Sequence, residues 1–574
     1  MSDLLVQAFD RLAQAPGGVA RLRELILSLA VEGKLVSQDP RDAPVSTLLA
    51  RIQARRKNLV TEGMIKASKP ESPAVNRDVP FVLPPGWEWI CAADACLVIT
   101  DGDHQAPPKA DSGVPFLVIG DVREGAVDLG LATRFVAHDY FDGLDWGKKP
   151  LLGDLLYTTV GSLGIPVPVV QQQAFCFQRH IALLRPGLPE LQPFLTLVLQ
   201  SRFAFNQAER GATGIAQKTV PLSVLRRLRL PLPPLAEQAR IVTRVDELMR
   251  LCDALEAKGR LEAEQHTRLL GTLLGTLTDS ATPEELAANW QRVAEHFDLL
   301  LDRPEAVDAL EQTVLQLAVR GLLVLQDPSD EPASVLLRKI HAEKNRLIAE
   351  GKIKRDKPGP SIADNDDSID LPQGWSSTYV GDVVDMLNGY AFKSEWFKPA
   401  GTRLLRNVNI AHGHVDWNTP AYVDAALAKE YGQFALDEGD LVLTLDRPII
   451  SSGLKFAVIG ERDLPCLLLQ RVARLSPDPR VLSRDFLVLW MLSDAFIGAL
   501  DPGRSNGVPH ISTKQVASMP FRLPPIAEQA RIVARVTELR RLCADLRQRL
   551  ATSQATQSRL AEALVESVAS VASV

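Results

Sequence analysis

The 574-residue sequence lacks the features that mark secreted, membrane-spanning and disulfide-rich proteins. No basic flank followed by an apolar run opens it, as a secretory signal would. Its most apolar window, Phe486–Leu500, is interrupted by Asp494 and falls short of the ~18 residues of a membrane-spanning helix. Only Cys91 and Cys96 of the six cysteines lie close together. We therefore expect a cytoplasmic protein with reduced thiols and no membrane association.

Motifs of the common nucleotide-dependent and metal-dependent enzymes are also missing. There is no G-x-x-x-x-G-K-[ST] loop, no H-E-x-x-H pair and no paired CxxC. Gly161–Gly164 follows a predicted strand but leads into Pro166 and Pro168, which disfavours a dinucleotide-binding or methyl-donor-binding turn. The Pro-Pro pairs are preceded by leucine, where an adenine methyltransferase box carries Asn or Asp (Leu83, Leu232 and Leu523). We expect no catalytic residue and no metal site in this chain.

The overall composition is that of an ordinary globular protein, with 46% hydrophobic and 23% charged residues. At ~150 residues per domain, the length predicts about four structural units. The net charge of -6 conceals local differences, because residues 141–230 carry ten Lys/Arg against five Asp/Glu, and residues 441–522 carry ten against seven. Such local excess can supply phosphate contacts in an acidic chain. These counts fit ordinary charge fluctuation equally well.

One stretch occurs twice and organises the rest of the chain. Residues 230–255 read LPLPPLAEQARIVTRVDELMRLCDAL, and residues 521–546 read FRLPPIAEQARIVARVTELRRLCADL. Each copy opens with Pro-Pro, which ends a strand and is tolerated in the first turn of a helix. Apolar positions then step by four and three, as in the seam of a coiled coil. These positions are Ile241, Val245, Leu248, Cys252, Leu255, Leu269 and Leu273, and Ile532, Val536, Leu539, Cys543, Leu546, Leu550, Leu560 and Leu564.

Polar residues interrupt each seam in its second half: Gly259, Glu262, His266, Ser553 and Gln557. About 43 residues at ~1.5 Å per residue would make a rod of roughly 60 Å. A long helix with such a seam is usually structural, and two matching rods in one chain most simply pack against each other.

The segment that precedes each copy is also duplicated. Helical periodicity covers residues 9–63, with a second helix predicted from Val45 to Glu62, and the whole unit recurs 288 residues later. Matching landmarks in the two units are Phe9 and Phe297, Gly33 and Gly321, Gln38-Asp39-Pro40 and Gln326-Asp327-Pro328, and LPPGW at 83–87 and LPQGW at 371–375. The chain is therefore a tandem duplication rather than a many-copy solenoid.

The intervening segments, residues 88–229 and 376–520, align poorly with each other. Short β-branched and aromatic runs, separated by Gly, Pro and Asp, predict strands in a mixed α/β (α+β) domain. The predicted strands lie at 116–119, 154–159 and 180–184 in the first segment, and at 403–405, 440–444, 455–459 and 471–475 in the second. Helices are predicted near 188–208 and 483–500. Similar frames around dissimilar middles predict the same task on different targets.

With LPPLAEQARIV at 232–242, LPPIAEQARIV at 523–533 and the two Trp motifs, the sequence resembles the specificity subunits of Type I restriction–modification enzymes. The resemblance covers essentially the whole chain. It implies two target-recognition domains, each reading half of a split, asymmetric DNA site, and two helices that pair as an antiparallel coiled coil and set the distance between the halves. It implies double-stranded DNA, two modification (adenine N6-methyltransferase) subunits and restriction (translocase–nuclease) subunits as partners.

The resemblance further implies that the chain itself has no activity and no cofactor, whereas the assembled complex uses S-adenosylmethionine, ATP and Mg. The duplicated helical unit resembles a feature of only some members, and we expect it to pack beside the coiled coil and to contact the modification subunits. The expected parts are a helical unit (1–82), target-recognition domain 1 (83–232), a central helix (233–279), a second helical unit with linker (280–370), target-recognition domain 2 (371–523) and a distal helix (524–574).

Base reading requires bidentate donors, with phosphate contacts fixing the register. Polar residues at predicted loops and strand ends are therefore the candidate DNA contacts. In domain 1 they are His104, Gln105, Lys109, Lys148, Lys149, Thr159, Ser162, Arg179 and Lys218. In domain 2 they are Tyr390, Lys393, Arg406, Asn407, Asn409, Arg447, Ser451, Lys455, Arg504, Asn506 and His510. Each is also interpretable as a solvated surface or turn residue.

Two other functions remain open from the residues alone. One is a coiled-coil scaffold that does not touch DNA, and the other is a self-contained methyltransferase or nuclease with unrecognised motifs. The physical logic favours a reader of DNA, because recognition elements about one helical turn (~34 Å) apart meet the major groove from one side of the duplex. A chain with two different domains needs no palindromic site.

Overall fold

The computed structural model describes residues 12, 15–66, 81–103, 105, 107–122, 127, 129–214, 217–280, 282–351, 371–451, 453–500 and 510–571. The chain divides into unit 1 (Met1–Glu262 with Ser553–Val574) and unit 2 (Ala263–Thr552). Both boundaries fall inside the two longest helices, so each helix contributes one part to each unit. Among the described helices, none is both long and apolar enough to cross a bilayer.

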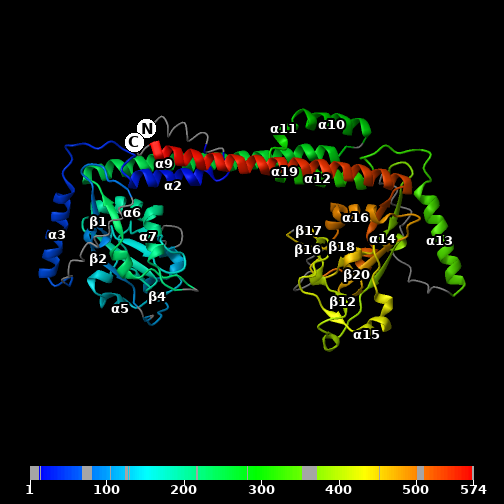
Figure 1. Ribbon diagram of the computed structural model, residues 1–574, viewed down its shortest axis with the longest axis horizontal. Coiled ribbons are helices and arrows are strands. Elements are labelled where there is room, and N and C mark those ends of the chain that lie inside the picture. The colour runs from blue at the N-terminus through cyan, green and yellow to red at the C-terminus, as the bar shows by residue number, and fades with distance from the viewer. Residues whose placement is uncertain are drawn as a thin grey trace. The chain divides into compact units, whose positions relative to one another are not determined.

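The two long helices, α9 (Leu235–Thr278, 44 residues) and α19 (Ile526–Val571, 46 residues), begin at the two copies of the repeated motif. In unit 1, Ile241 and Cys252 of α9 share a core with Ala561 near the end of α19 (Figure 1). In unit 2, Leu274 near the end of α9 shares a core with Cys543 of α19. The start of one helix therefore meets the end of the other, and the predicted antiparallel pairing is confirmed.

The predicted seam is wrong beyond the polar gap in both helices. Leu269 and Leu560 are 53% and 61% exposed, whereas their neighbours Leu270 and Ala561 are 5% and 2% exposed. Leu273 is only partly buried, and Leu274 and Leu277 occupy the core instead.

The helical period explains this shift. Leu270 and Ala561 each lie 18 residues beyond a buried cysteine, Cys252 and Cys543, and 18 residues are five turns of an undistorted α-helix. No residue of 253–269 or 544–560 is buried, so no continuous packing imposes the 3.5-residue coiled-coil repeat across the gap. The polar gap itself is confirmed.

The duplicated helical unit packs beside the long helices, as expected. In unit 1, α2 (Gly18–Val31) buries Leu22 and Ile26 in the core that contains Ile241, and Arg21 pairs with Glu562 at 2.8 Å. In unit 2, the equivalent helix is α12 (Pro304–Val319), whose Glu311 pairs with Arg540 of α19 at 2.7 Å. The remaining helices of these segments are α3 (Val45–Thr61), α10 (Pro283–Glu295), α11 (Phe297–Leu300) and α13 (Ala333–Ala349).

Two sheets form the α/β domain of unit 1. An antiparallel sheet has the order β2 (Cys96–Asp101), β8 (Ile181–Pro186), β5 (Leu155–Thr158), β6 (Pro166–Pro168). The second has the order β4 (Phe135–Val136), β3 (Val114–Leu117), β7 (Cys176–Phe177), with β3 and β7 parallel. Strands therefore form at each predicted position. The helices are α4 (Ala92–Ala95), α5 (His138–Asp142), α6 (Gln192–Gln200), α7 (Arg202–Arg210) and α8 (Leu222–Arg226).

The domain of unit 2 repeats this plan with additions. Its main sheet has the order β11 (Val384–Asn388), β20 (Val472–Pro477), β15 (Leu441–Thr444), β18 (Phe456–Val458), β13 (His412–Gly413). A second sheet contains β14 (Tyr422–Val423), β12 (Thr402–Leu405) and β19 (Cys466–Leu468), and a hairpin contains β16 (Ile449–Ile450) and β17 (Gly453–Leu454). The helices are α14 (Val380–Val383), α15 (Ala425–Glu430), α16 (Arg484–Leu492), α17 (Asp494–Ile497) and α18 (Thr513–Ala517).

An additional strand pair closes each domain at its root. In unit 1, β1 (Glu88–Cys91) runs antiparallel to β9 (Arg229–Leu232), and in unit 2, β10 (Ser376–Tyr379) runs antiparallel to β21 (Pro520–Leu523). The chain therefore enters and leaves each domain side by side, immediately before the Pro-Pro step into a long helix. Sequence patterning alone missed both pairs, because the partners lie more than a hundred residues apart.

The repeated motif joins each long helix to the helical unit that precedes it. In unit 1, Nε2 of Gln38 donates to the Gly33 carbonyl (2.8 Å) and to Oε1 of Glu237 (3.1 Å). Arg240, one turn further along α9, pairs with Asp42 at 2.7 Å. In this way the Glu and Arg of the motif bind the loop that follows α2.

Unit 2 repeats these contacts almost atom for atom. Gln326 donates to the Gly321 carbonyl (2.7 Å) and to Oε1 of Glu528 (3.1 Å), and Arg531 pairs with Asp330 at 2.6 Å. Glu237 and Glu528 are 1% and 0% exposed, and burial raises the pKa of both carboxyl groups.

Gly33 shows how closely this junction is packed. Its φ of +70° favours glycine, and an added Cβ would lie 2.4 Å from Cγ of Pro84 and 3.0 Å from the Trp87 ring. We predict that Gly33→Ala lowers the free energy of unfolding by roughly 2–4 kcal/mol, which combines backbone strain with overpacking. Thermal or denaturant unfolding of the full chain measures it.

Gly63 is the matched control, because it ends α3 with a φ of +72° and an added Cβ there meets nothing within 4 Å. Gly63→Ala should therefore cost only the strain, about 1–2 kcal/mol. Equal losses in the two variants would contradict the packed junction.

Candidate nucleic-acid interface

The end of β5 brings together several candidates in the first domain. Thr159 is buried, and its amide and hydroxyl donate to the His180 carbonyl at 3.0 and 2.9 Å, so it holds this strand end instead of facing solvent. Arg179 is exposed and donates to the His180 ring nitrogen at 3.3 Å. Ser162 is exposed on the following loop, and Lys218, paired with Glu209 at 2.8 Å, enters the segment that bridges Val160.

Other candidates of the first domain lie apart from this strand end. Lys148 pairs with Asp103, which also accepts a hydrogen bond from Tyr140. Lys149 donates to the Asp142 carbonyl and lies 5.3 Å from the centre of the Phe141 ring. Both lysines are therefore engaged within the domain. Two further candidates are exposed: Gln105 and Lys109.

In the second domain, four candidates converge on a residue that sequence analysis missed. Asp446, at the end of β15, is 6% exposed. Its Oδ2 accepts hydrogen bonds from Asn407 (3.1 Å) and from Arg471 (2.9 Å), and its Oδ1 lies 3.1 Å from Nδ1 of His510. Arg447 follows it directly in sequence.

Lys455 joins the same group, because its ammonium donates to the Asn407 carbonyl. Burial lowers the pKa of Lys455, which shows that this end of the sheet is partly shielded from water. The Asp446 cluster, defined here as Asn407, Asp446, Arg447, Arg471 and His510, thus lies at the ends of strands and beside a buried amine. Only its convergence in space identifies Asp446 and Arg471, since neither stands out in the sequence.

The backbone at this cluster is unusual as well. Arg447 (φ 47°) and Arg471 (φ 68°) are the two non-glycine residues with positive φ in the described part of the chain. A left-handed backbone costs an L-residue roughly 1–2 kcal/mol. Backbone strain of this kind collects at binding sites, where the fold has to hold a side chain in one place.

Four further candidates of the second domain have mainly structural contacts or lie elsewhere. Arg406 donates to the Thr419 carbonyl, and Asn409 is fully buried and donates to the Asp416 carbonyl at 3.0 Å. Tyr390 stacks 4.5 Å from Tyr431 in a mostly aromatic core, at whose edge Lys393 lies 5.4 Å from the Trp396 ring.

Ser451 is exposed at the tip of the β16–β17 hairpin. Three candidates lie outside the described residues: His104, Arg504 and Asn506.

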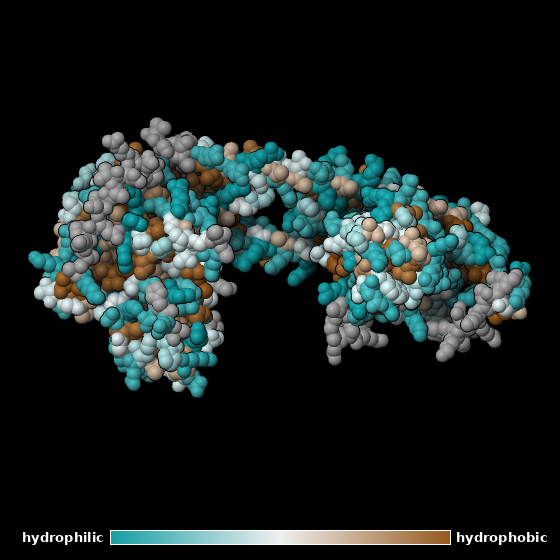
Figure 2. Space-filling model, turned by 60° about the horizontal axis from the view of Figure 1, so that its bottom comes forward, coloured by the Kyte–Doolittle hydropathy of each residue, from teal (hydrophilic) through white to brown (hydrophobic). Residues whose placement is uncertain are grey.

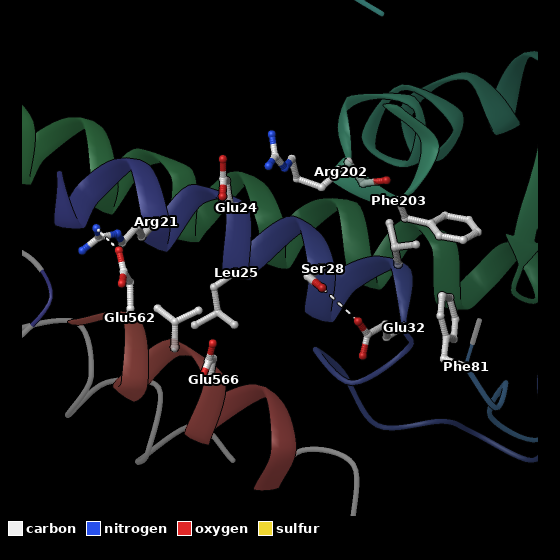
Figure 3. A pocket seen from close by; sticks show the side chains of 13 residues that line it. Arg21, Glu24, Leu25, Ser28, Glu32, Phe81, Arg202, Phe203, Glu562 and Glu566 are labelled. Carbon is white, nitrogen blue, oxygen red and sulfur yellow. Dashed lines mark hydrogen bonds and ion pairs between the residues drawn. The ribbon is translucent and has the colours of Figure 1, made fainter. Parts of the chain in front are cut away.

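The clearest cavity in the molecule does not suit DNA. About 400 Å³ in volume, it lies in unit 1 between α2, the last turns of α19 and the start of α7 (Figure 3). Its lining contains two arginines and more carboxylates, which are Glu24, Glu32, Glu562 and Glu566. A lining with excess negative charge repels a phosphate backbone. Among the described residues, no group of three or more His, Cys, Asp or Glu side chains is placed to hold a metal ion.

The outer surfaces of the two domains are better suited to a polar ligand. Figure 2 shows the visible, coloured atoms of each unit as an intermixed surface in which hydrophilic residues surround smaller hydrophobic groups. Interfaces with DNA are more polar and wetter than interfaces between proteins. The strand-end clusters provide donors for such a ligand without a deep pocket.

Comparisons with known proteins agree with this geometry. Residues 153–265 match the family model of the Type I restriction modification DNA specificity domain. The Escherichia coli Type I restriction enzyme EcoAI specificity subunit is 42% identical over 569 residues, which cover 96% of this chain and 93% of that protein. The EcoEI specificity subunit of the same organism is 32% identical, also covering 96% and 93%.

A crystal structure of the HsdS subunit from Thermoanaerobacter tengcongensis aligns with a TM-score of 0.40 at 19% identity, covering 86% of this chain and 98% of that one. The sequence relatives carry the family assignment without it.

Proposed function

The chain belongs to the specificity subunits of Type I restriction enzymes, and from this premise we propose that its two domains read the two halves of a bipartite, asymmetric DNA site. The protein is the DNA-recognition subunit of a restriction–modification system and is not itself an enzyme. We assign the readers to residues 83–232 and 371–523. Neither the scaffold without DNA contact nor the self-contained enzyme finds support among the relatives.

One observation carries the proposal of two readers. The junctions around Glu237 and Glu528 repeat the same hydrogen bonds, at 3.1 Å from the loop glutamine in both copies. The domains that enter and leave at these junctions share their strand order but differ in the side chains at their strand ends. A constant frame that carries two different polar surfaces suits two independent half-site readers.

The long antiparallel helices set the spacing between the two readers in this proposal. Each helix begins directly where a reader ends, so its length determines where the next reader attaches. Two modification subunits and the restriction subunits complete the assembly, and they supply the sites for S-adenosylmethionine, ATP and Mg. The helical units beside the coiled coil offer them a surface, and the complex acts in the cytoplasm.

DNA binding and methyl transfer separate this function from its alternatives. We predict that the purified chain, alone or with its modification subunits, binds duplex DNA with an affinity that falls steeply with salt, because phosphate contacts release counterions. With S-adenosylmethionine, adenine methylation should appear only when the modification subunits are added. Filter binding and incorporation of labelled methyl groups measure the two properties.

Methyl transfer by the chain alone would instead support the self-contained enzyme. Salt-independent association, or binding that persists after both domains are removed, would support the scaffold.

The exposed middle of each long helix permits a test of the spacing role. We predict that one extra turn of about four residues in each exposed stretch, 253–269 and 544–560, widens the half-site spacing while both half-site sequences persist. Four residues add roughly 6 Å to a helix, close to two base pairs of ~3.4 Å. Mapping of methylated adenines in cells that carry the variant measures both properties.

The matched control places the same insertion in the β16–β17 hairpin tip around Ser451, which should leave the spacing unchanged. An insertion in the helices that changed a half-site sequence would contradict the role of a spacer.

A further inference from the structure

The two domains repeat one set of backbone contacts at the end of a central strand. In domain 1, the amide of Thr159 donates to the His180 carbonyl at 3.0 Å. In domain 2, the amide of Leu445 donates to the Arg471 carbonyl at 2.8 Å. The next residue along each strand then bridges the segment that leads to the exit strand, Val160 with Thr219 and Asp446 with His510. These contacts establish which positions correspond.

The side chains at the matched positions differ in kind. Val160 corresponds to Asp446, His180 to Arg471 and Thr219 to His510. Burial and the neighbouring Arg179 lower the pKa of His180, so its imidazole is neutral at physiological pH. Domain 1 therefore places an uncharged group where domain 2 places an ion pair. Because the backbone contacts are the same in both domains, the fold does not require this difference.

The position after the bridge makes the same point through its backbone. Gly161 has a φ of +73°, and its counterpart Arg447 has a φ of +47°. Glycine adopts this conformation without strain, whereas arginine does not. Arg447 is exposed and has no side-chain hydrogen bond or ion pair within the described part of the chain, so no internal contact explains its presence.

Asp446 fixes part of this surface and leaves the rest open. It is buried, and such a carboxylate is stable only with charged or hydrogen-bonding partners, which Asn407 and Arg471 supply. The Arg471 side chain remains 60% exposed although one of its nitrogens is held at 2.9 Å. One edge of the guanidinium is thereby positioned, and its other donors face solvent. Arg447 adds a second guanidinium beside it.

We propose that the Asp446 cluster is the specificity-determining site of domain 2, in which Arg447 and Arg471 read guanine bases and Asp446 is their positioning residue. This inference rests on the proposed function. A guanidinium carries donors only, and guanine presents two acceptors, O6 and N7, in the major groove, which arginine contacts in a bidentate manner. The matched residues of domain 1 lack a guanidinium at the corresponding positions, so that domain reads a different base there.

Sequence selection on random DNA tests the assignment. The full chain with its modification subunits is incubated with a pool of randomised duplexes, and the bound DNA is sequenced. The wild type should enrich a bipartite motif, and Asp446→Asn should reduce the preference for guanine at one or two positions of one half-site about ten- to hundredfold. The other half-site should not change.

Asp478→Asn is the matched control. It removes a second Asp–Arg pair of the same domain, the contact between Asp478 and Arg480, and should leave the motif intact. A motif unchanged by Asp446→Asn, or a loss spread over both half-sites, would overturn the assignment.

Arg447→Gly covers the case in which Asp446→Asn disrupts the fold. This variant relieves the backbone strain, so its melting temperature should equal or exceed that of the wild type, while the guanine preference falls as above. A stable Arg447→Gly variant with the wild-type motif would refute the reading role. If the wild type enriched no motif at all, the proposed function would itself be contradicted, and the assignment with it.

Discussion

A carboxylate buried in the first turn of each long helix is the constraint on which the architecture depends. Glu237 and Glu528 are almost inaccessible to water, and a buried carboxyl group is costly unless hydrogen bonds satisfy it. Gln38 and Gln326 donate those bonds from the loop after the preceding helix, and the Trp375 indole adds a third donor in unit 2 at 3.1 Å. The helix, the exit of the domain and the helical unit are thereby joined at one point.

This junction separates two tasks that would otherwise compete for the same residues. Contacts that hold the frame lie at the root of each domain, where an entry strand pairs with an exit strand and the chain turns into a long helix. Candidate contacts with DNA lie at the ends of other strands, and the Asp446 cluster shows how much their chemistry can vary on one backbone. Substitutions at the strand ends leave the junction untouched. The chain therefore accommodates two dissimilar readers in one repeated frame.

Much of the fold could be predicted from sequence because its signals are local or repeated. The strand positions, the long helices and the duplicated helical units follow from periodicity and self-similarity, and the structure contains all of them. The seam failed at Leu269 and Leu560, since heptad spacing was extended across a stretch where no packing enforces it. An unconstrained helix returns to the same face after 18 residues, which selects Leu270 and Ala561 instead.

The candidate site was less predictable for a different reason. Residue type and predicted strand ends pointed to Asn407, Arg447, Lys455 and His510, but the residue that unites them is an aspartate, which sequence reasoning about DNA contacts passes over. Asn409 and Thr159 have suitable side chains but are buried, and their hydrogen bonds close loops. Sequence supplies the donors of an interface, whereas burial and partner geometry decide which of them face outward.

Exchange of one reader tests the central claim, two independent readers in one frame, most directly. Residues 88–229 are replaced by the corresponding domain of another specificity subunit, and methylated adenines are mapped across the genome of cells that express the chimaera with its modification subunits. The account predicts a motif in which one half is new, the other half is retained and the spacing is unchanged. A change in both halves would contradict it.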